Sequence, residues 1–279
     1  MKKQIASLLF AIASSLILCP FTVSADSDKA LSFEEFVAVD NDVCSITITD
    51  IDADNIWGYT LNALMENRSA DKTYMFSVES ASINGVQTDP FFADEIAPGK
   101  KANEEISFSG LEDYGITDFT DIELNFRVYD SEDWMADDVV RETVHVYPYG
   151  EENASLYVRE PQDTDRVLID NDIASVVVTD IEEDAIWGYT LNLFINNKTD
   201  ANLMIGVDEA SVNGFMIDPF FATDVHAGKC EFTSVSWSDS ALEENGITDV
   251  QEIELLLKVS DYDDWMAEDY VNERVVITP

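Results

Sequence analysis

Cysteine is scarce in this chain of 279 residues, which contains three. Cys19 lies in the apolar N-terminal segment, so a chain processed after that segment retains only Cys44 and Cys230. A secreted protein held by disulfides carries more cysteines, at paired spacings. The pattern excludes a disulfide-built scaffold and favours two solitary or buried thiols, with one bridge between Cys44 and Cys230 as the open alternative.

Positive charge is scarce as well, with 15 Lys and Arg against 57 Asp and Glu and a formal net charge of -42. The acidic residues are spread evenly along the chain rather than gathered in a tail. A field of this sign repels phosphate backbones and anionic lipid, so nucleic-acid and membrane-surface binding are disfavoured. It favours solubility and cationic partners such as metal ions, basic peptides or basic protein surfaces.

Long apolar runs are confined to the N-terminus. Residues 1–25 begin with two lysines, continue with an apolar run and end in Val-Ser-Ala, which is typical of a bacterial export signal cleaved after Ala25. Cys19 follows Leu18, whereas a lipoprotein needs a small residue there, so a lipid anchor is not expected. No later stretch is long and apolar enough to span a bilayer. We therefore expect a secreted, extracellular or envelope-associated soluble protein.

The rest of the chain contains an internal duplication. Residues 40–69 align without gaps to residues 170–199, with about half of the positions identical. Further blocks recur in the same order, namely SINGVQTDPFFA as SVNGFMIDPFFA, then GITD, then DWMA. This predicts two domains of ordinary size after the signal. Their expected boundaries are module 1 at 26–148, a polar linker at 149–165 with a short strand at 156–158, and module 2 at 166–279.

Within each copy, apolar and polar residues alternate, which is the pattern of strands that bury one face. Examples are Cys44, Ile46 and Ile48 in the first copy and Ile253, Leu255, Leu257 and Val259 in the second. Asn84-Gly85 and Asn213-Gly214 predict two-residue hairpin turns. Residues 110–115 and 240–246 each predict one short helical turn. About seven strands per copy predict an all-β protein of two tandem immunoglobulin-like antiparallel β-sandwich domains, with a barrel as the alternative.

The heptapeptide IWGYTLN occurs at residues 56–62 and again at 186–192. Trp57 and Tyr59 are in phase with the apolar residues that follow them, which predicts that both belong to the core. Gly58 then faces the other way, where a neighbour comes close. The alternative is a platform of exposed aromatic rings on which a sugar stacks.

The second copy carries a recognisable set of turn and strand residues. They are a Gly-Tyr-x-Leu strand (188–191) ending in Asn-Lys-Thr (197–199), then Val-Asn-Gly, Ala-Gly-Lys, Leu-x-x-x-Gly-Ile and an Asp-rich turn. This pattern resembles the secreted Ig-like β-sandwich modules of unknown function in Gram-positive bacteria, which are similar to the immunoprotective extracellular antigen sandwich. The resemblance covers nearly the whole mature chain and implies the fold, but no active site. The first copy departs from it at 67–69 and 98–100.

No set of residues that could catalyse a reaction occurs in both copies. The two histidines, His145 and His226, have no counterpart in the other copy, and we expect both to be solvated surface residues. No Cys–His or Ser–His–Asp set occurs twice. A carboxylate pair for glycoside hydrolysis cannot be singled out among so many acids. There is no Gly-rich phosphate loop and no zinc-spaced cluster. The sequence therefore predicts no catalytic or cofactor-binding residues.

The best candidates for a metal site are acidic turns that recur in both copies. They are Asp50/Asp52/Asp54 with Asp180/Glu182/Asp184, and Asp130/Asp133 with Asp261/Asp264. The first of these resembles the start of a calcium loop, in which alternate carboxylates face the ion. The match is incomplete, because the sixth position is Asn55 and the twelfth is Leu61. Calcium is thus one hypothesis, and solvated turns are the other.

The favoured function is a secreted, non-enzymatic protein that binds an unknown extracellular protein, peptide or glycan. One alternative is a carbohydrate-binding module, accessory domain or hydrolase of a glycan-active system. It requires Trp134, Trp237 or Trp265 to be exposed near carboxylates. A calcium-stabilised envelope protein is the other alternative and is compatible with the first function.

Overall fold

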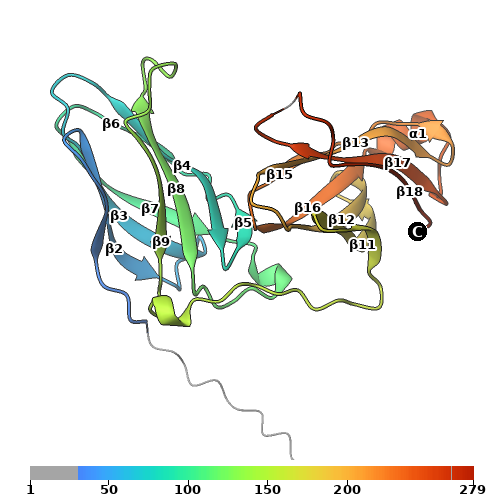
Figure 1. The fold of residues 1–279 in the computed structure, drawn as a ribbon, viewed down its shortest axis with the longest axis horizontal. Coiled ribbons are helices and arrows are strands. Elements are labelled where there is room, and N and C mark those ends of the chain that lie inside the picture. The colour runs from blue at the N-terminus through green and yellow to red at the C-terminus, as the bar shows by residue number, and fades with distance from the viewer. Residues whose placement is uncertain (1–30, 265) are drawn as a thin grey trace, which may run out of the picture. The chain divides into compact units, whose positions relative to one another are not determined.

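The computed structural model describes residues 31–264 and 266–279, most of which lie in β-strands (Figure 1). Among them there is one α-helix, α1 (Asp239–Glu244), and two 3-10 turns, η1 (Glu112–Tyr114) and η2 (Glu151–Asn153). The predicted all-β class is therefore confirmed.

The predicted export signal, its cleavage after Ala25 and the lipidation of Cys19 fall outside the described residues. Within those residues, no helix is long and apolar enough to cross a membrane.

Residues 31–148, here called the first half, contain two groups of antiparallel strands. One sheet has the order β1-β2-β3-β7, and the other runs β5-β4-β8-β9, with β6 also paired to β4. The strands are β1 (Phe36–Asp40), β2 (Cys44–Asp52), β3 (Tyr59–Asn67), β4 (Tyr74–Ile83), β5 (Val86–Thr88), β6 (Ala93–Ile96), β7 (Lys101–Phe108), β8 (Ile122–Asp130) and β9 (Val140–Val146).

Residues 166–279, the second half, repeat this plan. The orders are β10-β11-β12-β16 and β14-β13-β17-β18, with β15 also paired to β13. The strands are β10 (Arg166–Asp170), β11 (Ala174–Ala185), β12 (Gly188–Asn197), β13 (Leu203–Val212), β14 (Phe215–Met216), β15 (Ala222–Val225), β16 (Cys230–Trp237), β17 (Ile253–Asp261) and β18 (Val271–Ile277). Both halves are consistent with a β-sandwich.

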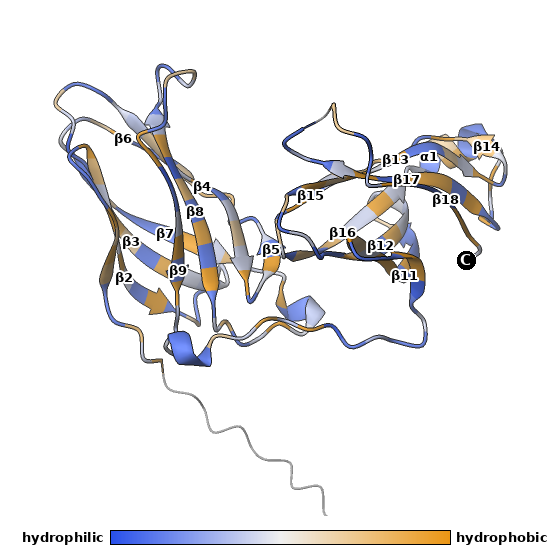
Figure 2. Cartoon of the chain, viewed as in Figure 1, coloured by the Kyte–Doolittle hydropathy of each residue, from blue (hydrophilic) through white to orange (hydrophobic). Residues whose placement is uncertain are grey.

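Each half has a hydrophobic cluster that takes residues from both of its groups of strands, and the first cluster also includes Cys230 of β16. The alternation predicted from the sequence is confirmed here, since apolar and polar residues alternate along the strands (Figure 2). All seven residues named as examples are buried. Burying one face of every strand is what stabilises such a layered fold, at about 25 cal/mol for each Å² of apolar surface removed from water.

The predicted turns are also confirmed. Asn84 and Gly85 have φ values of 52° and 81°, and Asn213 and Gly214 have 51° and 83°. Positive φ at both central residues defines the hairpin turn that joins β4 to β5 and β13 to β14. The predicted helical turns are η1 and α1.

Two sequence predictions about the strands were wrong. Each half has nine strands rather than about seven, because the segment after the Asn-Gly turn pairs with β4 or β13 in two short pieces separated by the Asp-Pro-Phe-Phe loop. Residues 156–158 do not form a strand. Tyr157 donates one backbone hydrogen bond to the Asn84 carbonyl at 2.7 Å, and its ring packs against the first hydrophobic cluster, so a ladder never forms.

One strand pair joins the two halves into a continuous nine-stranded sheet. β16 lies parallel to β5, with Cys230 opposite Val86. The Cys230 N–H donates to the Gly85 carbonyl at 3.0 Å.

Candidate functional site: apolar loop tips and an acidic cleft

The prediction that Trp57 belongs to the core was wrong. Its side chain is 68% exposed, and that of Trp187 is 74% exposed. Ile56 and Ile186 before them are more exposed still. These residues lie in the turns that join β2 to β3 and β11 to β12, outside the buried faces of the strands. The prediction holds only for the tyrosine that follows: Tyr189 is buried and Tyr59 partly so.

A glycine explains why the turn pushes its apolar residues outward. Gly58 has a φ of +107°, and a Cβ placed there would lie 2.1 Å from the Phe108 carbonyl oxygen. Gly188 repeats this, at 2.3 Å from the Trp237 carbonyl oxygen. Only glycine permits such an approach, so the predicted close neighbour is confirmed. The turn is held against the end of β7 or β16, and the two residues before the glycine project away from it.

A second exposed apolar residue follows the Asp-Pro pair in each half. Phe91 and Phe220 are both 91% exposed. Asp89 accepts a hydrogen bond from the Phe91 N–H at 2.7 Å, which closes the turn. In the second half the Phe220 N–H donates to the Ser236 carbonyl at 2.7 Å, so this loop and the Trp187 turn both adjoin the end of β16. Sequence reasoning missed these residues, although their DPFFA motif is identical in both copies.

We call these exposed groups the apolar tips. They are Ile56, Trp57 and Phe91 in the first half and Ile186, Trp187 and Phe220 in the second. A third exposed pair, Trp134 and Met135, lies in the β8–β9 loop, and Met266 is exposed in the corresponding β17–β18 loop.

The acidic turns use their carboxylates to hold their own backbone. Asp52 accepts from the Asp54 N–H at 3.2 Å and from the Asn55 amide at 3.3 Å. Asp130 accepts from the Glu132 N–H and forms an ion pair with Lys72 at 2.7 Å. Such local bonds are the usual reason for aspartate in turns.

The second copy behaves in the same way. Asp261 accepts from the N–H groups of Asp263 and Asp264 and from the Tyr270 hydroxyl, and Glu182 accepts from the Asn192 amide at 2.6 Å. Nowhere in the described chain do three Asp, Glu, His or Cys side chains gather in a group that could hold a metal. The structure thus does not bring together the carboxylates Asp50, Asp52 and Asp54, Asp180, Glu182 and Asp184, Asp130 and Asp133, or Asp261 and Asp264 as calcium ligands.

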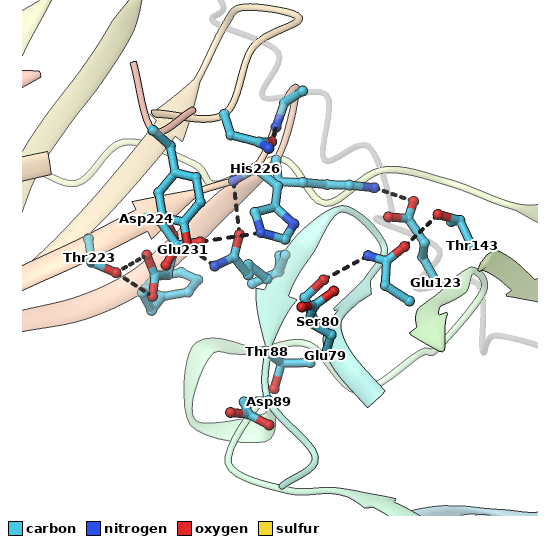
Figure 3. A pocket seen from close by; sticks show the side chains of 18 of the residues that line it. Glu79, Ser80, Thr88, Asp89, Glu123, Thr143, Thr223, Asp224, His226 and Glu231 are labelled. Carbon is cyan, nitrogen blue, oxygen red and sulfur yellow. Dashed lines mark hydrogen bonds and ion pairs between the residues drawn. The ribbon is translucent and has the colours of Figure 1, made fainter. Parts of the chain in front are cut away.

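A cleft of about 1110 Å³ lies where β5 meets β16, and residues of both halves line it. Figure 3 shows the Thr223 hydroxyl donating to the Glu231 carboxylate, at 2.8 and 3.1 Å from its two oxygens. Burial, together with the nearby charge of Asp224, raises the pKa of Glu231 to about 7. Burial disfavours the charged form of a carboxyl group, and an adjacent carboxylate adds to that cost.

The basic groups of the cleft are already engaged by carboxylates. The Lys229 ammonium lies 2.6 Å from Glu123, and Arg141 is paired with Glu79. These pairs cancel locally, so the cleft holds no free cationic centre that would attract an anion.

Both histidines are only partly exposed, and each lies beside a carboxylate. His145 is half-buried, with Nδ1 2.7 Å from Asp121. His226 is half-buried in the cleft wall, with Nε2 3.3 Å from Asp224. The pairing of β8 with β9 brings Asp121 to His145, whereas Asp224 lies two residues before His226 in the same segment of chain. Neither histidine has a serine or cysteine nucleophile among its hydrogen-bond partners.

The two cysteines are buried, free and unpaired in the described chain. Burial raises the pKa of each thiol to about 11. The thiolate is the reactive form, so both are inert at neutral pH.

Among the tryptophans named for a glycan site, Trp134 is exposed beside carboxylates, as that function requires. Trp237 is buried and donates its indole N–H to the Ile217 carbonyl at 3.0 Å. Trp265 falls outside the described residues.

Comparisons with known proteins give no functional lead. No family model and no curated protein matches this chain. Among solved structures, the crystal structure of red sea bream transglutaminase is similar over 86% of this chain and 31% of its own, at 11% identity and a TM-score of 0.21. The chain thus spans less than a third of that protein, and the likeness is too low to support an argument.

Proposed function

We propose that this is a secreted, non-enzymatic binding protein of two tandem Ig-like sandwiches, and that the apolar tips contact its partner. One observation carries the proposal: the same exposed apolar side chains occur at the same places in both copies. The export signal predicted from the sequence supports secretion, and the absence of a duplicated catalytic set supports a binding role.

Comparison of the two copies distinguishes residues that are retained because they pack in the core from residues that are retained for another reason. Buried positions have drifted conservatively, as in Ile46 against Val176 and Met65 against Ile195. The exposed tips have not drifted at all. Scattered exposed apolar residues need no explanation, but an Ile-Trp turn and a phenylalanine retained at matching positions cannot be attributed to packing, because they touch little of the protein itself.

The chemistry of the tips favours a protein partner. Tryptophan is among the residues that dominate binding energy at protein interfaces, and burying a large apolar side chain contributes about 1.5–3 kcal/mol. The rest of this surface is strongly acidic. A fitting partner is an extracellular protein with apolar pockets surrounded by basic residues, because its rim would be attracted by the acidic field.

The test is a double variant, Trp57→Ser with Trp187→Ser, in the chain from residue 26 to residue 279. The matched control is Val37→Thr with Val167→Thr, which alters exposed apolar residues retained at β1 and β10. Partners captured from the native extracellular fraction are quantified for wild type and both variants. We expect the tip variant to lose the partners that the control retains. Equal capture by all three proteins would show that the tips are not the binding surface.

A glycan is the second candidate ligand, and Trp134 favours it. An exposed indole beside Glu132 and Asp133 offers a stacking face together with hydrogen-bond acceptors. Titration with soluble oligosaccharides should then change the tryptophan fluorescence of wild type but not of Trp134→Phe. A response that survives in the variant assigns the sugar to another site.

A further inference from the structure

The contact between the two halves is a junction between two different strand edges. On one side is the β4–β5 hairpin of the first half, and on the other is the start of β16 in the second half. Besides the bond between Cys230 and Gly85, the Lys229–Glu123 ion pair crosses it at 2.6 Å. Gln87 makes two further bonds across it, to the carbonyl of Asp224 and from the N–H of His226.

Because the chain is duplicated, each half carries a counterpart of both edges. The junction uses β5 of the first half and β16 of the second. The counterpart of β5 is β14 in the second half, and the counterpart of β16 is β7 in the first half; the junction uses neither of them. Among the described residues, β14 pairs only with β13, and β7 pairs only with β3. The chain therefore keeps one unused edge of each kind.

The unused β14 edge has exposed apolar residues at the positions where its counterpart β5 meets β16. Val86 of β5 is 1% exposed and lies opposite Cys230 in the junction, within the first hydrophobic cluster, whereas its counterpart Phe215 is 48% exposed. The next residue, Met216, is 67% exposed. The strand registers confirm the correspondence, since Ile83 pairs with Val86 and Val212 with Phe215.

Counterparts of the Lys229–Glu123 ion pair are also present on the two unused edges. Glu123 lies opposite Ser82 of β4, and its counterpart Glu254 lies opposite Ser211 of β13 in the same register. The counterpart of Lys229 is Lys100, and Lys101 follows it. Lys101 already pairs with Glu66 at 3.2 Å, and Glu104 and Glu105 follow in β7. Lys100 is therefore the positive charge at this end of the edge that could meet Glu254.

We propose that the β14 edge of one molecule binds the β7 edge of a second copy of this chain. Phe215 and Met216 would be covered as Val86 is within the chain, and Lys100 of the second copy would meet Glu254, which also holds Arg274 at 2.7 Å. Such a contact joins unlike surfaces and does not close on itself, so it produces head-to-tail chains rather than a closed dimer.

This contact is weaker than the junction inside the chain. There, Phe232 stacks on Tyr114 at 3.9 Å between ring centroids and packs against Tyr157 of the linking segment. The counterparts of Phe232 and Tyr114 are Asn103 and Asn245. The linking segment also raises the effective concentration of the two halves, which separate molecules lack.

The experiment measures molecular mass by sedimentation equilibrium of residues 26–279, in 0.15 M salt to screen the net charge, at concentrations up to about 1 mM. One variant blocks β14 (Phe215→Glu with Met216→Glu), and one blocks β7 (Lys100→Glu with Lys101→Glu). All four positions are exposed, and circular dichroism verifies that both variants fold.

We expect wild type to form species larger than a dimer as concentration rises, and each variant alone to remain a monomer. A mixture of the two variants retains one intact edge of each kind and should form a dimer and nothing larger. A Glu254→Lys variant should associate with Lys100→Glu and not with wild-type β7. Wild type that remains a monomer, association that both blocked variants keep, or a mixture that yields no dimer would each overturn the proposal.

Discussion

Replacement of Glu231 by glutamine should stabilise the protein at alkaline pH and not at acidic pH. Glu231 lies in β16 opposite Ile195, with its carboxyl group held by the Thr223 hydroxyl. Burial and the charge of Asp224 raise its pKa from 4.5 to about 7. Glutamine keeps the shape and can still accept the hydroxyl hydrogen bond, but it never has to ionise.

The sign and size follow from proton linkage. Below pH 4.5 the carboxyl is protonated in the folded and the unfolded chain, so it adds no pH-dependent cost. Between pH 4.5 and about 7 the unfolded chain ionises freely while the folded chain resists ionisation, so stability falls as pH rises. Above about pH 7 the cost is complete. With 1.36 kcal/mol for each pKa unit, it is on the order of 3 kcal/mol.

Urea unfolding at pH 4, 6 and 8, at constant ionic strength, measures this effect. The matched control is Glu252→Gln, which removes an exposed carboxylate from the same half and reports the general relief of negative charge. The difference between the two variants should be close to zero at pH 4 and on the order of 3 kcal/mol at pH 8. A difference that is flat across this range would refute the raised pKa of Glu231.

Three further predictions concern other described residues. Gly58→Ala should lower the free energy of unfolding by about 2–4 kcal/mol, against about 1 kcal/mol for Gly99→Ala, because only the former brings a Cβ onto a carbonyl oxygen; equal losses in urea unfolding would contradict the close approach. A variant with Trp237 as its only tryptophan should resist acrylamide quenching, and one with only Trp57 should not; similar quenching constants would contradict the burial assigned to them. A thiol-specific disulfide reagent at pH 8 should label neither Cys44 nor Cys230 until urea is added, because burial raises both pKa values to about 11; rapid labelling of the folded protein would contradict this.

The sequence predicted those features that depend on neighbouring residues along the chain. In β17, the apolar residues that alternate from Ile253 to Val259 form the buried face of the strand, as predicted. The Asn-Gly turns were predictable because positive φ at two successive positions restricts the residues that fit. The all-β class follows from such local patterns summed over the chain.

The wrong prediction that Trp57 is buried shows what an alternating sequence pattern cannot report. The phase of a strand pattern says which residues share a face, but not where the strand begins. Here β3 begins at Tyr59, because the approach of Gly58 to Phe108 ends the pairing one residue earlier. That contact joins residues about 50 positions apart, so no local pattern reports it.

The junction was missed for a similar reason, yet the comparison of the copies contained a signal for it. Cys230 and Phe232 of β16 correspond to the polar residues Lys101 and Asn103 of β7. A strand that alternates in the same way in both copies, but has apolar residues on its outward face in only one, indicates that this face is covered only there.

Comparison of the two copies thus gives three physically distinct patterns. Core residues exchange one apolar side chain for another, because volume and hydrophobicity suffice to fill the interior. Junction residues are apolar in one copy and polar in the other, because only one copy of that edge is covered within the chain. The tips have not diverged, although they are exposed and contribute little to folding. A duplicated fold needs only the first pattern to be stable and only the second to join its halves, so the third is the observation on which the proposed binding function rests.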